Sequence, residues 1–231
     1  MTRSMRLLSI LTITCLTLSS GAALAAKGGK GGGGSGGGDS EPPAGCAAEP
    51  IVMVHGYLGS TSNFNTMEGR LQNAGEPTCA LFKFGYNSTG DSNQISAQRL
   101  KSFVDSALSA TGQAKARLVA HSNGGLVSRW YRVFEGGSTK TSKLITLGTP
   151  HQGTTWAYGC VSPACFEMRP NSSFLQSLGG KGCNVSLWSD ADEIIIPNSS
   201  AKCGKSTRTA SVGHNTLLTN AAVFDDVKKN L

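Results

Sequence analysis

The residues that most constrain the fold of this chain are a short apolar run that ends in a serine held between small residues. The run Leu118–His121 leads directly into Ser122, and a helix-compatible segment follows at once. A strand that turns straight into a helix forces the residue at the bend into strained backbone angles, and only small neighbours keep strand and helix from colliding. Ala120 and Gly124 meet that need. The pattern predicts a strand–turn–helix that presents the hydroxyl of Ser122 clear of a sheet.

This turn has two interpretations when it is taken alone. Ser, Asn and Gly are favoured in any such connection, so an ordinary turn would look similar. Alternatively, Ser122 is a nucleophile on an elbow of the G-x-S-x-G kind, with Ala120 in the first glycine position. The N–H of Asn123, at the start of the helix, would then face an oxyanion formed beside the serine. The rest of the chain must decide between the two.

Short apolar runs alternate with helical patterns through the rest of the chain. A run of strand length at Ile51–Val54 has the unbroken apolar character of a strand buried on both faces. Further strands are expected at Ala80–Phe84, Leu118–His121, Lys143–Leu147, Asn184–Ser189 and Thr207–Val212, and helices at Thr61–Gln72, Ser92–Thr111, Leu126–Glu135 and Thr216–Lys229. This alternation predicts an α/β fold with a mostly parallel central sheet and helices on both faces.

Three expected loops hold the groups that a nucleophilic serine requires. In a parallel α/β sheet, functional residues collect in loops at the carboxyl ends of strands. Tyr57 follows the first strand, and its N–H is a candidate second oxyanion donor. Acidic residues at 190–193 follow a later strand, and His214 follows the last one as a base. Serine, acid and histidine therefore appear in the order found in α/β-hydrolases.

The ordered motifs together resemble the small secreted bacterial lipases (lipase class 2) of the α/β-hydrolase superfamily. The motifs that carry the resemblance are Pro50–Gly56, Ala120–Gly125, Thr146–Thr154, Ser189–Asp192 and Val212–His214. The resemblance implies a minimal α/β-hydrolase fold with a small lid or none. It also assigns roles: nucleophile Ser122, base His214, acid Asp192, and oxyanion donors Tyr57 and Asn123. Asn123 is a departure, because a bulkier apolar residue is frequent at that position.

Other residues are alternatives for these roles or candidates for contact with the substrate. Asp192 matches the S-x-A-D pattern of these lipases, and Asp190 and Glu193 are the alternative acids. His121 is expected to point away from the nucleophile, because neighbouring side chains diverge on an elbow, whereas His55 is expected to order the oxyanion loop. Two aromatic residues of the long segment after Pro150 are candidates to line an acyl groove or form a small cover: Trp156 and Tyr158.

The resemblance implies a carboxylic-ester hydrolase, in the first place a triacylglycerol lipase acting on a lipid or other ester. A short-chain esterase, a cutinase-like polyester depolymerase and an acyltransferase are the alternatives within the enzyme class, and a non-catalytic binding protein on a hydrolase scaffold is the alternative outside it. The calcium-binding aspartates of these lipases have no secure counterpart here. We therefore expect neither a metal nor a cofactor.

The N-terminal residues have the composition of export and linker segments. Arg3 and Arg6 precede the apolar run Leu7–Leu18, which is followed by small residues at Ala23–Ala25. Such an order predicts a signal peptide over residues 1–25, with an apolar run too short to be a transmembrane segment. The glycine-rich residues 26–40 are expected to be a flexible linker, and residues 41–231 the catalytic domain.

The number of cysteines indicates the redox compartment of the protein, and its charge limits the classes of partner it can bind. Six cysteines follow the signal, and an even number in an exported chain favours disulfides. Many pairings are possible, and the preferred ones are Cys46–Cys79, Cys160–Cys165 and Cys183–Cys203. The net charge of +7 is scattered, without the basic block typical of nucleic-acid binding. We expect a secreted monomer that makes transient contact with a lipid interface.

Overall fold

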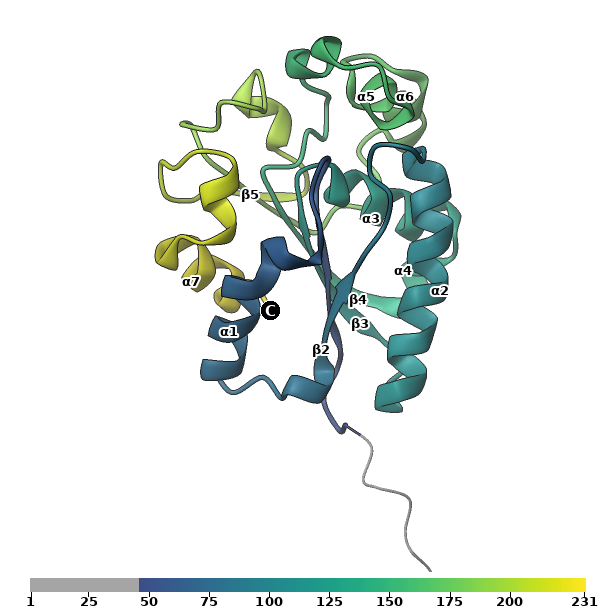
Figure 1. Ribbon diagram of the computed structural model, residues 1–231, viewed down its shortest axis with the longest axis vertical. Helices are drawn as coiled ribbons and strands as arrows, with labels where there is room; N and C mark the ends of the chain where they lie inside the picture. The colour runs from purple at the N-terminus through teal and green to yellow at the C-terminus, as the bar shows by residue number, and fades with distance from the viewer. Residues whose placement is uncertain (1–45) are drawn as a thin grey trace, which may run out of the picture. The chain divides into compact units, whose positions relative to one another are not determined.

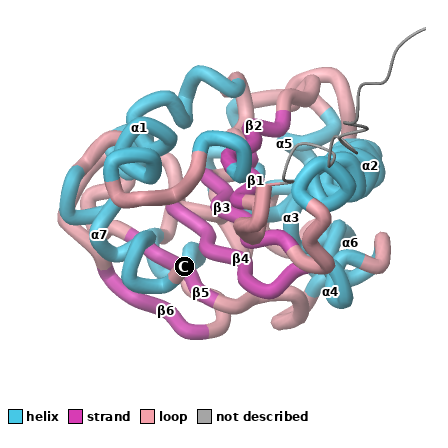
Figure 2. Tube along the Cα trace, turned by 90° about the horizontal axis from the view of Figure 1, so that it is seen from below, coloured by secondary structure: helices cyan, strands magenta, loops and turns pink. Residues whose placement is uncertain are grey.

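The computed structural model describes residues 46–231. The expected signal peptide and glycine-rich linker lie outside the described residues. Within the described part (Figure 1), six strands form one sheet in the order β2-β1-β3-β4-β5-β6 (Figure 2), and every pairing is parallel. The strands are β1 (Ile51–Val54), β2 (Leu81–Phe84), β3 (Ala116–His121), β4 (Thr141–Leu147), β5 (Val185–Trp188) and β6 (Lys205–Arg208). The parallel sheet expected from the sequence is confirmed.

Helices cover both faces of this sheet (Figure 2). One apolar core lies between the sheet and two helices, α1 (Asn65–Asn73) and α7 (Ala221–Asn230). The other lies between the sheet and α2 (Asn93–Thr111) with α3 (Asn123–Phe134). Adjacent residues of β1 alternate between the two cores, as expected of a strand buried on both faces.

Local capping signals set the ends of α2 where the sequence places them. The hydroxyl of Ser92 accepts a hydrogen bond from the amide of Ile95, so it satisfies one of the free N–H groups at the start of the helix. Gly112 ends the helix in the left-handed conformation, with φ 65°. α2 then packs against α3, and the start of α3 carries Asn123.

The last strand and the last helix differ from their expected bounds. The strand expected at Thr207–Val212 is β6, Lys205–Arg208, a largely exposed edge strand whose polar residues give no apolar pattern. The expected continuous helix divides into a 3₁₀ turn at Asn215–Leu218 and α7, because the side chain of Asn220 caps a new helix by accepting the amides of Ala222 and Val223.

A small cover lies between β4 and β5 in sequence. It comprises a 3₁₀ turn at Thr155–Gly159, α5 (Pro163–Met168) and α6 (Ser173–Leu178), and we call residues 155–178 the cover segment. These short helices were not expected from the sequence. The cover segment shares an apolar cluster with Leu126 of α3, and its size agrees with the expected small lid. The remaining short helix, α4, is Gly137–Lys140.

All three preferred disulfide pairings are present. Cys46–Cys79 joins the segments before β1 and β2, Cys160–Cys165 closes a loop of the cover segment, and Cys183–Cys203 joins the segments before β5 and β6. Their Cα–Cα distances of 5.8, 5.9 and 5.8 Å are normal for disulfides. Among residues 46–231, no helix combines the length and the apolar character needed to cross a membrane.

Candidate active site

Ser122 occupies a strained elbow between β3 and α3. Its backbone has φ 54° and ψ −130°, a conformation that residues other than glycine rarely adopt. The amide of Ser122 donates to the carbonyl of Leu147 at 2.8 Å, and the hydroxyl of Thr149 donates to the carbonyl of Ser122 at 2.8 Å. A β-carbon on Gly124 would lie 2.3 Å from the carbonyl oxygen of His55. Glycine is therefore required two positions after the serine, as the sequence pattern indicates.

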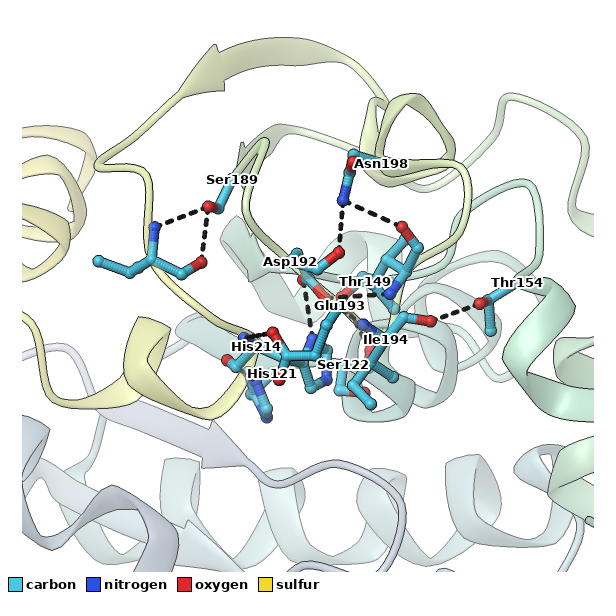
Figure 3. Close-up of polar contacts among 12 residues, drawn as sticks. His121, Ser122, Thr149, Thr154, Ser189, Asp192, Glu193, Ile194, Asn198 and His214 are labelled. Atoms are coloured by element: carbon cyan, nitrogen blue, oxygen red, sulfur yellow. Dashed lines mark hydrogen bonds and ion pairs between the residues drawn. The ribbon is translucent and has the colours of Figure 1, made fainter. Parts of the chain in front are cut away.

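Asp192 and His214 are paired beside the serine (Figure 3). Nδ1 of His214 lies 2.8 Å from Oδ2 of Asp192, and both side chains are buried. Oδ1 of Asp192 accepts the amides of Ile194 and Ile195 at 3.0 Å each, which leaves Oδ2 for the imidazole. Burial opposes ionisation of Asp192, but the hydrogen bonds from His214 and the two amides outweigh it, so the pKa of Asp192 lies below its ordinary value. An ionised carboxylate at this position favours a proton on Nδ1 and leaves Nε2 free.

The two alternative acids occupy other positions. Asp190 is exposed, and its carboxylate binds Arg208 at 2.8 Å and accepts the hydroxyl of Ser211. Glu193 accepts the backbone amide of His214 at 3.0 Å. The imidazole of His214 therefore faces Asp192, and the neighbouring carboxylates contact the loop around it.

A backbone contact of His55 orients the first oxyanion candidate. Nδ1 of His55 donates to the carbonyl of Gly56 at 2.9 Å, while Nε2 lies 3.4 Å from the amide of Tyr86 and accepts from it. The C=O and N–H of one trans peptide point in opposite directions. A carbonyl of Gly56 held toward His55 therefore turns the N–H of Tyr57 the other way. The expectation that His55 orders this loop agrees with these contacts.

The second oxyanion candidate begins a helix. Asn123 is the first residue of α3, so its amide has no carbonyl of its own helix to donate to. Its buried side chain bonds to Asn93 at the start of α2, with a distance of 2.7 Å between Nδ2 and Oδ1. The polar side chain that departs from the lipase pattern is thus bonded to a neighbouring helix through Nδ2, whereas its buried Oδ1 has no hydrogen-bond partner among residues 46–231.

Four of the expected site residues line a cavity of about 260 Å³, whereas Asp192 and Asn123 do not. Ser122 and His214 line it with Tyr57, and so does Trp156 of the cover segment. Tyr158, the other expected substrate contact, is exposed and does not line this cavity; the guanidinium of Arg169 lies 5.2 Å from its ring centroid. The remaining lining residues are Gly56, Leu58, Gly59, Asn63, His121, Thr154, Met168, Ile194, Ile195 and Asn215.

A family model for palmitoyl protein thioesterase matches residues 50–191. The chain belongs to this family. Triacylglycerol lipases from Pseudarthrobacter phenanthrenivorans and Burkholderia plantarii are each 31% identical to it over 114 residues, which is 47% of this chain. The aligned part spans only 35% and 31% of those two lipases.

Solved structures show the same fold at low sequence identity. Mature lipase BlEst2 from Bacillus licheniformis has a TM-score of 0.69 and 18% identity, covering 83% of this chain and 94% of that one. Aspergillus fumigatus lipase B has a TM-score of 0.66 and 15% identity, covering 80% and 53%. The α/β-hydrolase fold and the likeness to lipases are therefore confirmed. Beyond the shared fold, the chain is similar in sequence to hydrolases of the lipase and thioesterase kind.

One of the remaining histidines lies differently from what the sequence predicts. His121 does not turn away from the site: its ring lines the cavity and packs on that of His214, with 4.5 Å between centroids. His151 lies buried between Arg129 and Thr146. His151 is also close to Cys183 and Cys203, but those two sulfurs are joined in a disulfide, so this group is not a metal site.

Some lining residues were missed by the sequence analysis. Met168 comes from α5, a helix too short to give a periodic signal. Ile194 and Ile195 directly follow the acid loop, and their apolar run after four polar or small residues was the available sign. Leu58 adjoins the oxyanion loop and is largely exposed, with φ 58°. These residues contribute apolar surface to the cavity wall.

Proposed function

We propose that this chain is a secreted serine ester hydrolase, in the first place a triacylglycerol lipase or lipase-like esterase. The observation that carries the proposal is the buried pair of Asp192 and His214 at the same cavity as the strained Ser122. Strain at a buried serine costs folding energy, and such strain is typical of functional sites. A binding protein on the same scaffold would need none of the three groups.

The proposed reaction passes through an acyl-enzyme. Ser122 attacks the ester carbonyl carbon while Nε2 of His214 takes the hydroxyl proton, and Asp192 keeps Nδ1 protonated and stabilises the imidazolium. The amides of Tyr57 and Asn123 stabilise the tetrahedral oxyanion. The imidazolium then protonates the departing alcohol. Water, activated by His214, releases the carboxylic acid from Ser122 by the same route.

The cavity supports an apolar acyl group as the bound part of the substrate. Trp156, Met168 and Ile195 contribute apolar surface to its wall, and Leu58 is exposed at the same cavity. Apolar walls with a few placed polar groups are typical of small-molecule sites. Exposed apolar side chains near the cavity also fit transient contact with a lipid interface.

The proposal extends to the setting of the enzyme. Three disulfides within residues 46–231 agree with an oxidising compartment. We assign residues 1–25 to a cleaved signal peptide, 26–40 to a linker and 41–231 to the catalytic domain of a secreted monomer. Mass spectrometry of the secreted protein tests this assignment: a mature N-terminus far from residue 26 would contradict it.

The deciding experiment measures initial hydrolysis rates on p-nitrophenyl esters from butyrate to palmitate, with Ser122→Ala beside the purified mature protein. Cleavage of the long-chain esters together with an inactive variant supports a lipase. Cleavage confined to short chains favours an esterase or a polyester depolymerase. Equal background rates from both proteins would refute the hydrolase proposal.

An acyl thioester is a second candidate substrate, because the matched palmitoyl protein thioesterase model spans Ser122 and reaches Ala191, the residue before Asp192. The same acyl-enzyme chemistry would release a thiol in place of an alcohol. Rates with palmitoyl-CoA, read as free thiol, are compared with those for p-nitrophenyl palmitate. A higher kcat/KM for the thioester would move the assignment to thioesterase.

A further inference from the structure

Side chains beside Ser122 and Asp192 hold the backbone of His214. With His214, these two residues form the proposed catalytic triad. His214 lies between the end of β6 and the 3₁₀ turn that begins at Asn215, so no strand pairing fixes it. Its N–H donates to Oε2 of Glu193 at 3.0 Å, and its carbonyl oxygen lies 3.1 Å from Nε2 of His121. Glu193 directly follows Asp192 in the chain, and His121 directly precedes Ser122 (Figure 3).

His121 has the chemistry of a permanent donor. Its partner is a carbonyl, which only accepts, so Nε2 of His121 must carry the proton. Burial, with a further contribution from the nearby His214, lowers the pKa of His121 to about 3. The ring therefore stays neutral and keeps one N–H directed at His214 over the whole neutral and mildly acidic range. Its packing against the ring of His214 adds a second contact.

Glu193 has a weaker hold on the other backbone group of His214, its N–H. Its carboxylate accepts the amide of His214 from an exposed position. A β-carbon on Gly213 would lie 2.9 Å from Oε2 of Glu193, so glycine at 213 permits this close approach. Water can replace an exposed acceptor at small cost, whereas a buried carbonyl that loses its donor has no such replacement.

We propose that His121 and Glu193 are positioning residues that clamp the backbone of His214, so that its ring keeps its bond to Asp192 and presents Nε2 to Ser122. The inference rests on the proposed hydrolase function. Because each clamp residue adjoins another triad member in the chain, displacement of either loop is passed directly to the imidazole. His121 is the dominant member because its contact is buried.

Matched variants separate the hydrogen bond from the bulk of each side chain. His121→Phe keeps an aromatic ring but removes the donor, and His121→Gln keeps a donor. Glu193→Ala removes the acceptor, and Glu193→Gln keeps one. Misplacement of a reacting group by about 1 Å can cost roughly 100-fold in rate. We expect kcat of His121→Phe to fall by up to about that factor with KM unchanged, and His121→Gln to recover most of it.

Glu193→Ala should lower kcat by only a few-fold, with Glu193→Gln at the wild-type value. Wild-type kcat in His121→Phe would overturn the proposal, as would equal losses in His121→Phe and His121→Gln. Thermal unfolding checks that each variant folds. If His121→Phe does not fold, His121→Met replaces it as the variant without a donor.

A proton NMR measurement tests the clamp without turnover. The proton between Nδ1 of His214 and Asp192 should give a far-downfield resonance in the wild-type protein, identified by its loss in Asp192→Asn. We expect that resonance to broaden or vanish in His121→Phe and to persist in His121→Gln. A resonance unchanged in His121→Phe overturns the clamp. A wild-type protein that shows the resonance but cleaves no ester refutes the proposed function alone.

Discussion

The two sides of the cavity are held by different forces. The loops that carry Ser122, Asp192 and His214 are fixed by hydrogen bonds of about 3 Å, several of them to charged or buried groups. The cover segment, by contrast, rests on α3 mainly through apolar contacts, with Phe174 stacked on Trp130 at 4.7 Å between centroids. Hydrogen bonds are directional and fix atoms within tenths of an ångström. Apolar packing fixes the filled volume and tolerates the exchange of one apolar side chain for another of similar size.

The two kinds of attachment should affect different properties of the enzyme. Changes among the polar loops should act on kcat, because they move reacting atoms. Changes in the cover segment should act on the choice of acyl chain or on stability, because they alter the shape and the attachment of one wall. A change in the cover segment that lowers kcat for every ester, or a change in a polar loop that alters only the choice of acyl chain, would contradict this division.

The largest effect is expected at the acid. Asp192→Asn leaves the shape of the site but favours the wrong tautomer of His214, which in a comparable triad lowers kcat by about 10⁴. Asp190→Asn is the matched control, because Asp190 binds Arg208 at the surface. Steady-state rates on a p-nitrophenyl ester measure both. A large loss in Asp190→Asn with a nearly normal Asp192→Asn would reverse the assignment.

A smaller loss is expected behind the oxyanion loop. His55→Phe removes the side-chain donor to the carbonyl of Gly56 and leaves only the amide of Gly59, at 3.1 Å, so the N–H of Tyr57 is held less firmly. Loss of one oxyanion donor typically costs about 10²-fold or more in kcat, and we expect a loss of up to about 10² with KM little changed. Tyr86→Phe is the control, since it keeps the stacking on His55 but loses the bond from the hydroxyl to the carbonyl of His55. If Tyr86→Phe is as slow as His55→Phe, the loop is not held by the imidazole.

The same contrast explains which parts could be predicted from the sequence. The apolar strands β1 and β3 and the capped helix α2 have local signals that agree with their buried positions, and their bounds were nearly right. The edge strand β6 has polar, exposed residues, so nothing in its own pattern indicates where it ends. The helices of the cover segment are too short to show a period.

The site divides in the same way. The proximity of Ser122, Asp192 and His214 could be expected from the sequence, because each belongs to a motif in a segment that follows a strand. The contact of His121 could not, because its partner carbonyl belongs to a residue 93 positions later in the chain. The local geometry of the elbow predicts the backbone position of His121. Its contact with a residue far away in the sequence appears only in the folded structure.

The attachment of the cover segment predicts a pH-dependent stability. Oε2 of Glu167 on α5 accepts the amide of Asn93 at the start of α2 at 2.6 Å, and burial raises the pKa of Glu167 from 4.5 to about 7. The folded protein therefore holds this proton more tightly than the unfolded chain. Its contribution to stability is greatest below pH 4.5 and falls as the pH rises toward 7.

Glu167→Gln should remove this fall while keeping an acceptor for Asn93. Between pH 5 and pH 8, the free energy of unfolding of the wild type should fall by about 2 kcal/mol more than that of the variant. The figure follows from roughly 1.4 kcal/mol per unit of pKa shift, reduced because the carboxyl is partly solvated. Urea unfolding at the two pH values measures it. Asp225→Asn, at an exposed position of α7, controls for the loss of one charge. A wild-type stability independent of pH in this range would show that the carboxyl is not buried in solution.

The smallest effect separates wall shape from packing within the cover segment. Met168 and Leu175 belong to the same apolar cluster and are both buried, but only Met168 lines the cavity. Truncation of either to alanine should cost about 2 kcal/mol or more of stability.

Met168→Ala should also enlarge the acyl site and raise the ratio of kcat/KM for palmitate to that for butyrate by about tenfold, since added methylenes in a pocket are worth about 1–3 kcal/mol. The chain-length profile of Leu175→Ala should match that of the wild type, because its lost volume does not open on the cavity. Equal shifts in both variants would mean that the cover segment acts through its overall position, and that apolar packing on this side fixes reacting geometry as well as volume.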